Sequence, residues 1–315
     1  MLSLFCFSSR GPESSCSKLI RLWIAENFVE AGSKSLEMVA MDYLMDLIRS
    51  NLVMVAKINF SGEIKAVHIH DLMHEFILVK AKNVNFLLRI NDGGTLSLAS
   101  EARCKRVNIL APCQVLLGDR FCFGRNINTL RFLPNVNSPF VDYDLTKSRE
   151  HLRVLDLGSV RLHQTLVDAL QFLIHLKYLQ LRIYFLEIPR SICNLKELET
   201  FIVTGEYNHI NIPNTIWDIT SLRLLHISPL YIIRGELEDL HNLQTCSDLV
   251  IFPGMDYQRF MKRFHNLLKL NCLLSGSGTT LRYFFPSFDS LIQLESLKIG
   301  VSTAVVDVGS HIVVM

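Results

Sequence analysis

The chain has 315 residues, and its 32 lysines and arginines nearly balance its 30 aspartates and glutamates, for a formal net charge of +2. This balance argues against a protein that binds a polyanion by bulk electrostatic attraction, and a hydrophobic content of 49% argues against a disordered chain. Leucine alone accounts for 50 residues, yet no apolar run approaches the ~18 residues that a membrane-spanning helix needs. So much leucine calls for a periodic explanation.

The cysteines and the N-terminal residues indicate the compartment. Eight cysteines are spread thinly over the chain, and no two of them have the Cys-x-x-Cys spacing. This favours reduced thiols in a cytosolic protein over a disulfide framework. The apolar stretch Met1–Phe7 lacks a basic flank and a clear cleavage site, so we do not predict a signal peptide. Residues 1–17 remain an unassigned N-terminal segment.

The next part of the chain predicts a small domain with helices and a hairpin. Residues 18–30 and 36–50 carry apolar side chains at helical spacing, which predicts two helices. Residues 52–69 form two β-rich runs around a turn, which predicts a hairpin. We expect Asp71 to act as the N-cap of a third helix that ends near Lys82.

This order of helix, helix, hairpin and helix is typical of a winged-helix module, which we assign to residues 18–90. Residues 91–126 are assigned to a connector or a first irregular repeat. Helix 36–50 holds one arginine against three acidic residues, and that charge repels phosphate. Direct DNA binding by a recognition helix is therefore disfavoured.

A frame Leu-x-x-Leu-x-Leu, with apolar substitutes, recurs in residues 127–315. Its first five starts are 22 to 25 residues apart, within the period of leucine-rich repeats. A second pattern repeats in phase at Ile188-Pro189 and Ile212-Pro213, and we expect a less regular repeat to start at Leu243. Stacked units of this kind form a solenoid with a continuous ladder of leucines inside. The frames start at Ile127, Leu152, Leu176, Leu198, Leu222, Leu267 and Leu294.

Side chains between the ladder leucines are expected to point outward on the concave face of the solenoid. Their mixed charge and partly aromatic character are typical of a surface that recognises proteins. In such a surface a minority of the side chains supplies most of the binding energy. These partner-binding candidates are Arg131, Asp156, Tyr178, Gln180, Arg182, Ile202, His226, Lys269, Asn271 and Lys298.

Three motifs in the first part resemble those of plant nucleotide-binding leucine-rich-repeat (NLR) immune receptors. Lys18–Val29 is similar to the first helices of their second ARC subdomain, and Tyr43–Val53 is similar to the next helix. Ile69–Asp71 resembles their Met-His-Asp motif. With the repeats, the resemblance covers about residues 18–300 and looks closest to the coiled-coil class, in particular the late-blight-resistance-like receptors of nightshade plants.

The resemblance implies a role in plant defence, in the cytoplasm or peripherally at membranes. In the intact family the repeats fold against the nucleotide-binding (NB-ARC) part, restrain it, and recognise pathogen effectors or guarded host proteins. Release then lets ADP exchange for ATP and triggers localised cell death. The resemblance assigns His70 to sensing the phosphate of ADP and Asp71 to supporting the resting state. A purely structural alternative is that Asp71 only caps the helix and His70 only closes the strand.

The sequence also departs from the family. It contains no Gly-x-x-x-x-Gly-Lys-Ser/Thr loop to bind phosphates, and no segment resembles the rest of the nucleotide-binding core. We therefore expect a fragment or paralogue that is not an enzyme and that holds no cofactor in this chain, whereas the full-length family binds ADP or ATP.

The sequence disfavours two further interpretations. His68, His70 and His74 have ligand-like spacing, but they fall on two different predicted elements and have no cysteine nearby, which disfavours zinc. A leucine-rich-repeat adaptor of the F-box kind would need an adaptor-binding helix pair, and residues 18–82 fit the immune-receptor pattern better. The overall prediction is a winged-helix module of α+β type followed by a leucine-rich-repeat solenoid, with protein partners and no direct contact with nucleic acid.

Overall fold

A computed structural model of the chain gives two compact units, which we describe separately. The first comprises Met1–Val160 with Leu176–Tyr178, and the second comprises Arg161–His175 with Leu179–Met315. The structure describes residues 14–30, 32–60, 62–90, 104–110, 127–133, 150–160, 162, 164–185, 187–206, 210–232, 240–251, 256–275, 282, 284–302 and 312–314.

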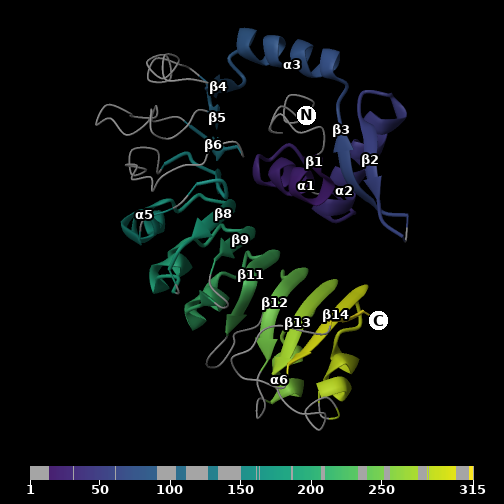
Figure 1. Cartoon of the computed structure of the whole chain (residues 1–315), viewed down its shortest axis with the longest axis vertical. Coiled ribbons are helices and arrows are strands. Elements are labelled where there is room, and N and C mark those ends of the chain that lie inside the picture. Colours follow the sequence, from purple (N-terminus) through teal and green to yellow (C-terminus); the bar gives the residue numbers. More distant parts are fainter. Residues whose placement is uncertain are drawn as a thin grey trace. The chain divides into compact units, whose positions relative to one another are not determined.

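The first unit begins with the predicted order of helix, helix, hairpin and helix, which confirms the winged-helix fold (Figure 1). A short strand before the first helix pairs antiparallel with β3, so the small sheet has the order β1-β3-β2. The elements are β1 (Ser14–Ser15), α1 (Cys16–Ala25), α2 (Leu36–Arg49), β2 (Met54–Ile58), β3 (Ile64–His68) and α3 (Asp71–Asn83).

Local chemistry at the ends explains where these three helices start and stop. The Ser35 hydroxyl accepts a hydrogen bond from the Met38 amide at 3.3 Å and caps α2. After each helix, an asparagine takes the left-handed conformation that ends helices: Asn27, Asn51 and Asn85 have φ of 58°, 54° and 51°. A short polar side chain tolerates this conformation better than other non-glycine residues do.

The prediction that Asp71 caps the third helix is wrong by one residue. His70 is the N-cap of α3, and its Nδ1 accepts a hydrogen bond from the Leu72 amide at 3.3 Å. Asp71 is the first residue inside the helix, where the positive end of the helix dipole attracts its negative charge and the helix is stabilised.

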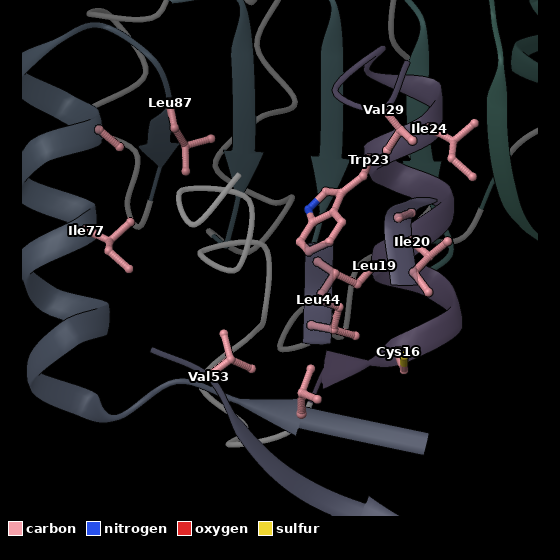
Figure 2. Packing of buried hydrophobic residues seen from close by; sticks show 13 residues of the cluster. Cys16, Leu19, Ile20, Trp23, Ile24, Val29, Leu44, Val53, Ile77 and Leu87 are labelled. Atoms are coloured by element: carbon pink, nitrogen blue, oxygen red, sulfur yellow. The ribbon is translucent and has the colours of Figure 1, made fainter. Parts of the chain in front are cut away.

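The core of the winged helix forms around the apolar face of α1. Trp23 is fully buried, and Figure 2 shows it beside Leu19 of the same helix and Leu44 of α2. Ile77 from α3 and Val53 at the start of the hairpin belong to the same cluster. The helical spacing in the sequence therefore identified the face that α1 buries, and burying one such large side chain contributes about 2 kcal/mol.

The described part of the repeats in the first unit comprises four parallel strands that belong to a larger sheet. Neighbouring strands pair in register, so that Val107 faces Leu130 and Leu130 faces Leu155. The ladder leucines therefore stack on one another inside the sheet, as the frame predicted. The strands are β4 (Leu88–Ile90), β5 (Arg106–Ile109), β6 (Thr129–Phe132) and β7 (Val154–Leu157). The first two precede the first recognisable frame.

The second unit continues the same pattern, and β8 (Tyr178–Ile183) passes from the first unit into it. Leu225 pairs with Phe201 on one side and Cys246 on the other, and Cys246 pairs with Leu270. The main strands are β9 (Thr200–Gly205), β11 (Leu224–Ile232), β12 (Thr245–Ile251), β13 (Lys269–Ser275) and β14 (Ser296–Ser302), with β10 (Ile210–Asn211) parallel to β11 and β15 (Ile312–Val314) antiparallel to β14. Strand β12 follows the buried Leu243 and confirms the predicted irregular repeat.

Short helices complete the repeats between the strands. Two of them, η6 (Arg190–Asn194) and η7 (Asn214–Asp218), begin directly after Pro189 and Pro213, the second repeating pattern of the sequence. Proline suits this position because its fixed φ is compatible with a helix start and it has no N–H to leave unpaired. The others are α5 (Gln164–Ala169), η5 (Leu170–Phe172), α6 (Tyr257–Met261) and η8 (Phe285–Ser290).

The pairing of strand β12 is irregular on both sides around Asp248, which has a φ of 66°. Against β13, Ser247 and Asp248 together face the single residue Asn271, as in a β-bulge. Against β11, the extra residues lie in β11, between His226 and Tyr231. Ser247 and Asp248 both contact His226 on β11.

Candidate functional site

The end of α1 carries a buried carboxylate that is bound by the first repeats. Glu26 is only 6% exposed, and its carboxylate binds the guanidinium of Arg106 on β5. Arg106 Nε lies 3.1 Å from both carboxylate oxygens, and Nη2 lies 2.8 Å from Oε2. The hydroxyl of Thr129 on β6 donates a further hydrogen bond to Oε1. A buried carboxylate needs this full set of donors, because an unpaired one would cost several kcal/mol.

Two aromatic rings hold the Arg106 guanidinium in place. Its central carbon lies 5.0 Å from the centroid of Phe28 and 4.3 Å from that of Phe86. Phe28 follows α1 and Phe86 follows α3, so both rings belong to the winged helix. Contacts of this kind favour arginine over lysine, because the planar guanidinium can pack on aromatic rings while it binds a carboxylate through two nitrogens.

The start of α1 makes a second charged contact with the repeats. Lys18 Nζ lies 2.8 Å from Asp156 Oδ2 on β7. Arg131 on β6 binds the same oxygen through Nε at 3.2 Å and Nη2 at 3.1 Å, and the Gly158 amide donates to Oδ1 at 3.3 Å. The side chains of Arg131 and Asp156 are both 3% exposed, whereas that of Lys18 is 34% exposed. One buried carboxylate thus joins a cation from α1 to a cation from the repeats.

Burial and charge act in opposite directions on this pair. Burial by itself would raise the pKa of Asp156, but the nearby charges of Lys18 and Arg131 and the Gly158 amide hold it below its usual 3.8. Burial lowers the pKa of Lys18, and Asp156 offsets only part of that effect. The carboxylate is therefore ionised at neutral pH and attracts both cations.

We call Lys18, Glu26, Arg106, Thr129, Arg131 and Asp156 the α1 contact. It lies wholly within the first unit and is extended at its edge by Lys177, whose Nζ donates to the Asn27 side chain at 3.1 Å. The two attachments lie at opposite ends of α1: Glu26 at its end is bound to β5 and β6, and Lys18 near its start is bound to Asp156 on β7. Two separated attachment points fix the helix against rotation as well as against separation.

The α1 contact corrects part of the sequence prediction. We expected Arg131, Asp156 and Tyr178 to point to solvent, but all three are buried. Arg131 and Asp156 lie under α1, and Tyr178 is close enough to Asp156 that burial and then this charge raise its pKa well above 10. The repeat frame identified these positions as outward-facing but contained no information on what covers them.

The other seven candidates keep some exposure, as expected. Lys269 and Lys298 are exposed, and the remaining five are partly exposed. Arg182 Nη2 binds Glu206 at 3.0 Å across neighbouring strands and lies 5.7 Å from the Tyr184 ring. The partly exposed group consists of Gln180, Arg182, Ile202, His226 and Asn271.

His70 and Asp71 lie together at the start of α3, and both are exposed. Because Nδ1 of His70 accepts the Leu72 amide proton, a neutral ring carries its own proton on Nε2. That N–H can donate to a phosphate oxygen, so the donor chemistry of His70 fits an ADP phosphate. Asp71 cannot donate to one, and among the described residues there is no group of three His, Cys, Asp or Glu side chains arranged to hold a metal ion.

Sequence reasoning missed Lys18, Glu26 and Arg106 as functional residues. A signal was present, because Lys18 and Glu26 lie near the two ends of a helix whose other residues are mostly apolar. Their partners on β5, β6 and β7 are 80 or more residues away in the chain, and no local pattern connects such distant positions.

Comparison with known proteins assigns this chain to a family. A profile described as a leucine-rich repeat region matches residues 135–312, which is more than half of the chain. The chain belongs to the leucine-rich repeat family. A second profile, described as the winged helix domain of disease resistance proteins, matches residues 10–77. The helix that carries Lys18 and Glu26 lies within that second match.

Curated relatives cover both parts of the chain. The putative late blight resistance protein homolog R1B-14 of Solanum demissum is 32% identical over 280 residues, which is 81% of this chain and 20% of the relative. Late blight resistance protein R1-A of the same plant is 32% identical over 295 residues, which is 81% of this chain and 21% of the relative. The chain thus spans about a fifth of the length of these relatives, and homology to late blight resistance proteins runs through most of it.

Among solved structures, the leucine-rich-repeat ectodomain of the Arabidopsis thaliana receptor kinase GASSHO1/SCHENGEN3 is 18% identical. The structural match covers 61% of this chain and 23% of the ectodomain chain, with a TM-score of 0.42. Within the described part of the chain, no helix is both long and apolar enough to cross a membrane.

Proposed function

We propose that this chain is the winged-helix and repeat segment of an intracellular plant immune receptor, and that the α1 contact restrains the receptor at rest. The observation that carries this proposal is the pair of buried carboxylates, Glu26 and Asp156, which join α1 to the first repeats. The matches to disease resistance winged helices and to late blight resistance relatives support it. They favour an immune receptor over an F-box-like adaptor.

In this proposal the two parts of the repeats have different tasks. The first repeats hold the winged helix through the α1 contact, so their concave positions are not available to a partner. The repeats of the second unit keep exposed polar side chains and meet a protein partner, either a pathogen effector or a guarded host protein, in the cytoplasm. The segment acts by binding, and we assign no catalytic step to its residues.

His70 is the one residue of this segment to which we assign a contact with a nucleotide. In a longer protein that supplies a phosphate-binding loop, His70 would donate from Nε2 to a phosphate of ADP. Asp71 then contributes to the start of α3 rather than to the ligand. Because α3 and α1 pack in one core, a change at His70 has a structural route to the α1 contact.

The restraint can be tested in leaves with a chimera. Residues 14–302 replace the matching part of a full-length late blight resistance relative, and cell death is scored after transient expression. The unchanged chimera should stay silent, whereas Asp156→Asn together with Glu26→Gln should cause cell death without an effector, because both attachments of α1 are weakened. The control is Glu197→Gln, which removes an exposed ion pair with His175. A silent double variant that accumulates to the normal level would contradict the proposal.

A further inference from the structure

Four strands of the second unit carry a polar cluster that the α1 contact does not involve. His226 on β11, Asp248 on β12, Asn271 and Lys269 on β13, and Lys298 on β14 all occupy outward positions of the repeat frame or the bulge beside them. These strands lie side by side in the green to yellow part of the chain (Figure 1).

The one carboxylate of the cluster already has donors from its own sheet. Asn271 Nδ2 donates to Asp248 Oδ1 at 3.0 Å, and His226 Nδ1 lies 3.4 Å from Oδ2. The same His226 nitrogen lies 2.5 Å from the Ser247 hydroxyl. The Asp248 side chain is 21% exposed, and burial raises its pKa from 3.8 although His226, Lys298 and Asn271 oppose this. Asp248 is therefore recessed and directed at its neighbours.

The two lysines are arranged differently. Lys269 and Lys298 are both exposed, and the register pairs Lys269 with Ser296 and Asn271 with Lys298. The lysines are thus diagonal neighbours on adjacent strands, with Cα atoms about 8 Å apart given the usual strand spacing and rise. This part of the sheet therefore presents two exposed ammonium groups to a partner.

We propose that this cluster binds an acidic segment of the protein partner, with Lys269 and Lys298 contacting two of its carboxylates. Carboxylates two residues apart in an extended peptide are separated by about 7 Å, which matches the spacing of the lysines. Asp248 limits the affinity of the cluster for the acidic segment, because its recessed carboxylate partly cancels the positive potential of the two lysines. The inference rests on the proposed function, since it takes the second unit to be the surface that meets a partner.

The test uses the full chain and a fluorescent hexaglutamate peptide as the probe, with binding followed by anisotropy. The Kd of the Lys269→Gln, Lys298→Gln double variant should rise at least tenfold, and Asp248→Asn should lower the Kd because it removes the opposing charge. Lys262→Gln removes an exposed lysine at the end of α6, outside the sheet, and should leave the Kd unchanged. Higher salt should weaken binding by the unchanged chain.

Two results would overturn the inference: equal Kd values for the double variant and the unchanged chain, or a hexalysine peptide that binds as tightly as hexaglutamate. Folding of each variant is checked through Trp217, which is buried in the second unit. Asp156→Asn should leave peptide binding unchanged, so failure of the peptide test does not depend on the leaf assay. Loss of restraint in leaves together with absent peptide binding would reject this inference alone.

Discussion

Asp156 and Asp248 both lie on strands of the repeats, but the fold shifts their pKa values in opposite directions. Asp156 in the first unit is bound by Lys18 and Arg131, and its pKa is lowered. Asp248 in the second unit has an amide and an imidazole as its near neighbours, and its pKa is raised by burial. The comparison shows that the repeat determines the position of a side chain on the sheet. The residues that pack around that side chain determine whether its pKa is lowered or raised.

The chain offers a direct way to compare the two units. It contains two tryptophans, Trp23 in the first unit and Trp217 in the second, and both are buried. Trp217→Phe leaves Trp23 to report on the first unit, and Trp23→Phe leaves Trp217 to report on the second. Fluorescence during urea unfolding then gives a separate free energy of unfolding for each unit.

The largest effect is expected for a charge placed in the leucine ladder. Leu155→Asp should destabilise the first unit by at least ~4 kcal/mol, because a carboxylate would replace a fully buried side chain without a partner. Ile292→Asp is the matched control, since Ile292 is 86% exposed and the same change should cost less than ~0.5 kcal/mol. Equal urea midpoints for the two variants would contradict the ladder.

The next effect separates the two aspartates. Asp156→Asn should lower the free energy of unfolding of the first unit by about 3 kcal/mol, because Arg131 is left buried without an opposite charge. Asp248→Asn should change that of the second unit by less than ~1 kcal/mol, because its charged form is not favoured by the fold. If the two substitutions have the same effect, the comparison fails.

Acid should also affect the two units in opposite directions. The pKa of Asp156 is lowered in the folded state, so its contribution is complete above 3.8 and is lost as the pH falls through the folded value, below 3.8. The pKa of Asp248 is raised, so its contribution is complete below 3.8 and is lost as the pH rises through the folded value. Between pH 5 and 3 the ratio of the two stabilities should shift toward the second unit, and Asp156→Asn should remove the part of the shift that comes from the first unit.

The smallest effect is expected at an exposed ion pair. His175 Nδ1 and Glu197 Oε1 lie 2.9 Å apart, but both side chains are nearly half exposed. Glu197→Gln should therefore change the stability of the second unit by less than ~0.5 kcal/mol. A loss above 1.5 kcal/mol would mean that distance alone, and not burial, determines what an ion pair contributes.

Much of the fold follows from spacing along the chain. Helical spacing identified the buried face around Trp23, and the leucine frame located the strands from β6 to β14 except the short β10, including the irregular one after Leu243. One error had a local cause, since His70 rather than Asp71 caps α3. Strand β5 lies within residues 91–126, which the sequence assigned to a connector or a first irregular repeat, and it pairs in parallel with β4 and β6.

The candidate site could not be predicted in the same way. Glu26 and Arg106 are 80 residues apart, and their contact depends on how the winged helix packs on the sheet. The bulge at Asp248 was also unpredicted, since an aspartate tolerates a left-handed backbone but does not by itself indicate one within a strand. Composition and periodicity describe single elements, whereas both features arise from pairs of elements.

The most direct test of the α1 contact is a double-mutant cycle between Glu26 and Arg106. Glu26→Gln, Arg106→Gln and the double variant are made in the Trp217→Phe background, and urea unfolding of the first unit is followed through Trp23. Because the two side chains form a buried bidentate pair, we expect a coupling free energy of at least ~1 kcal/mol. Effects that add to within ~0.3 kcal/mol would contradict the claim that this pair holds α1 to the first repeats.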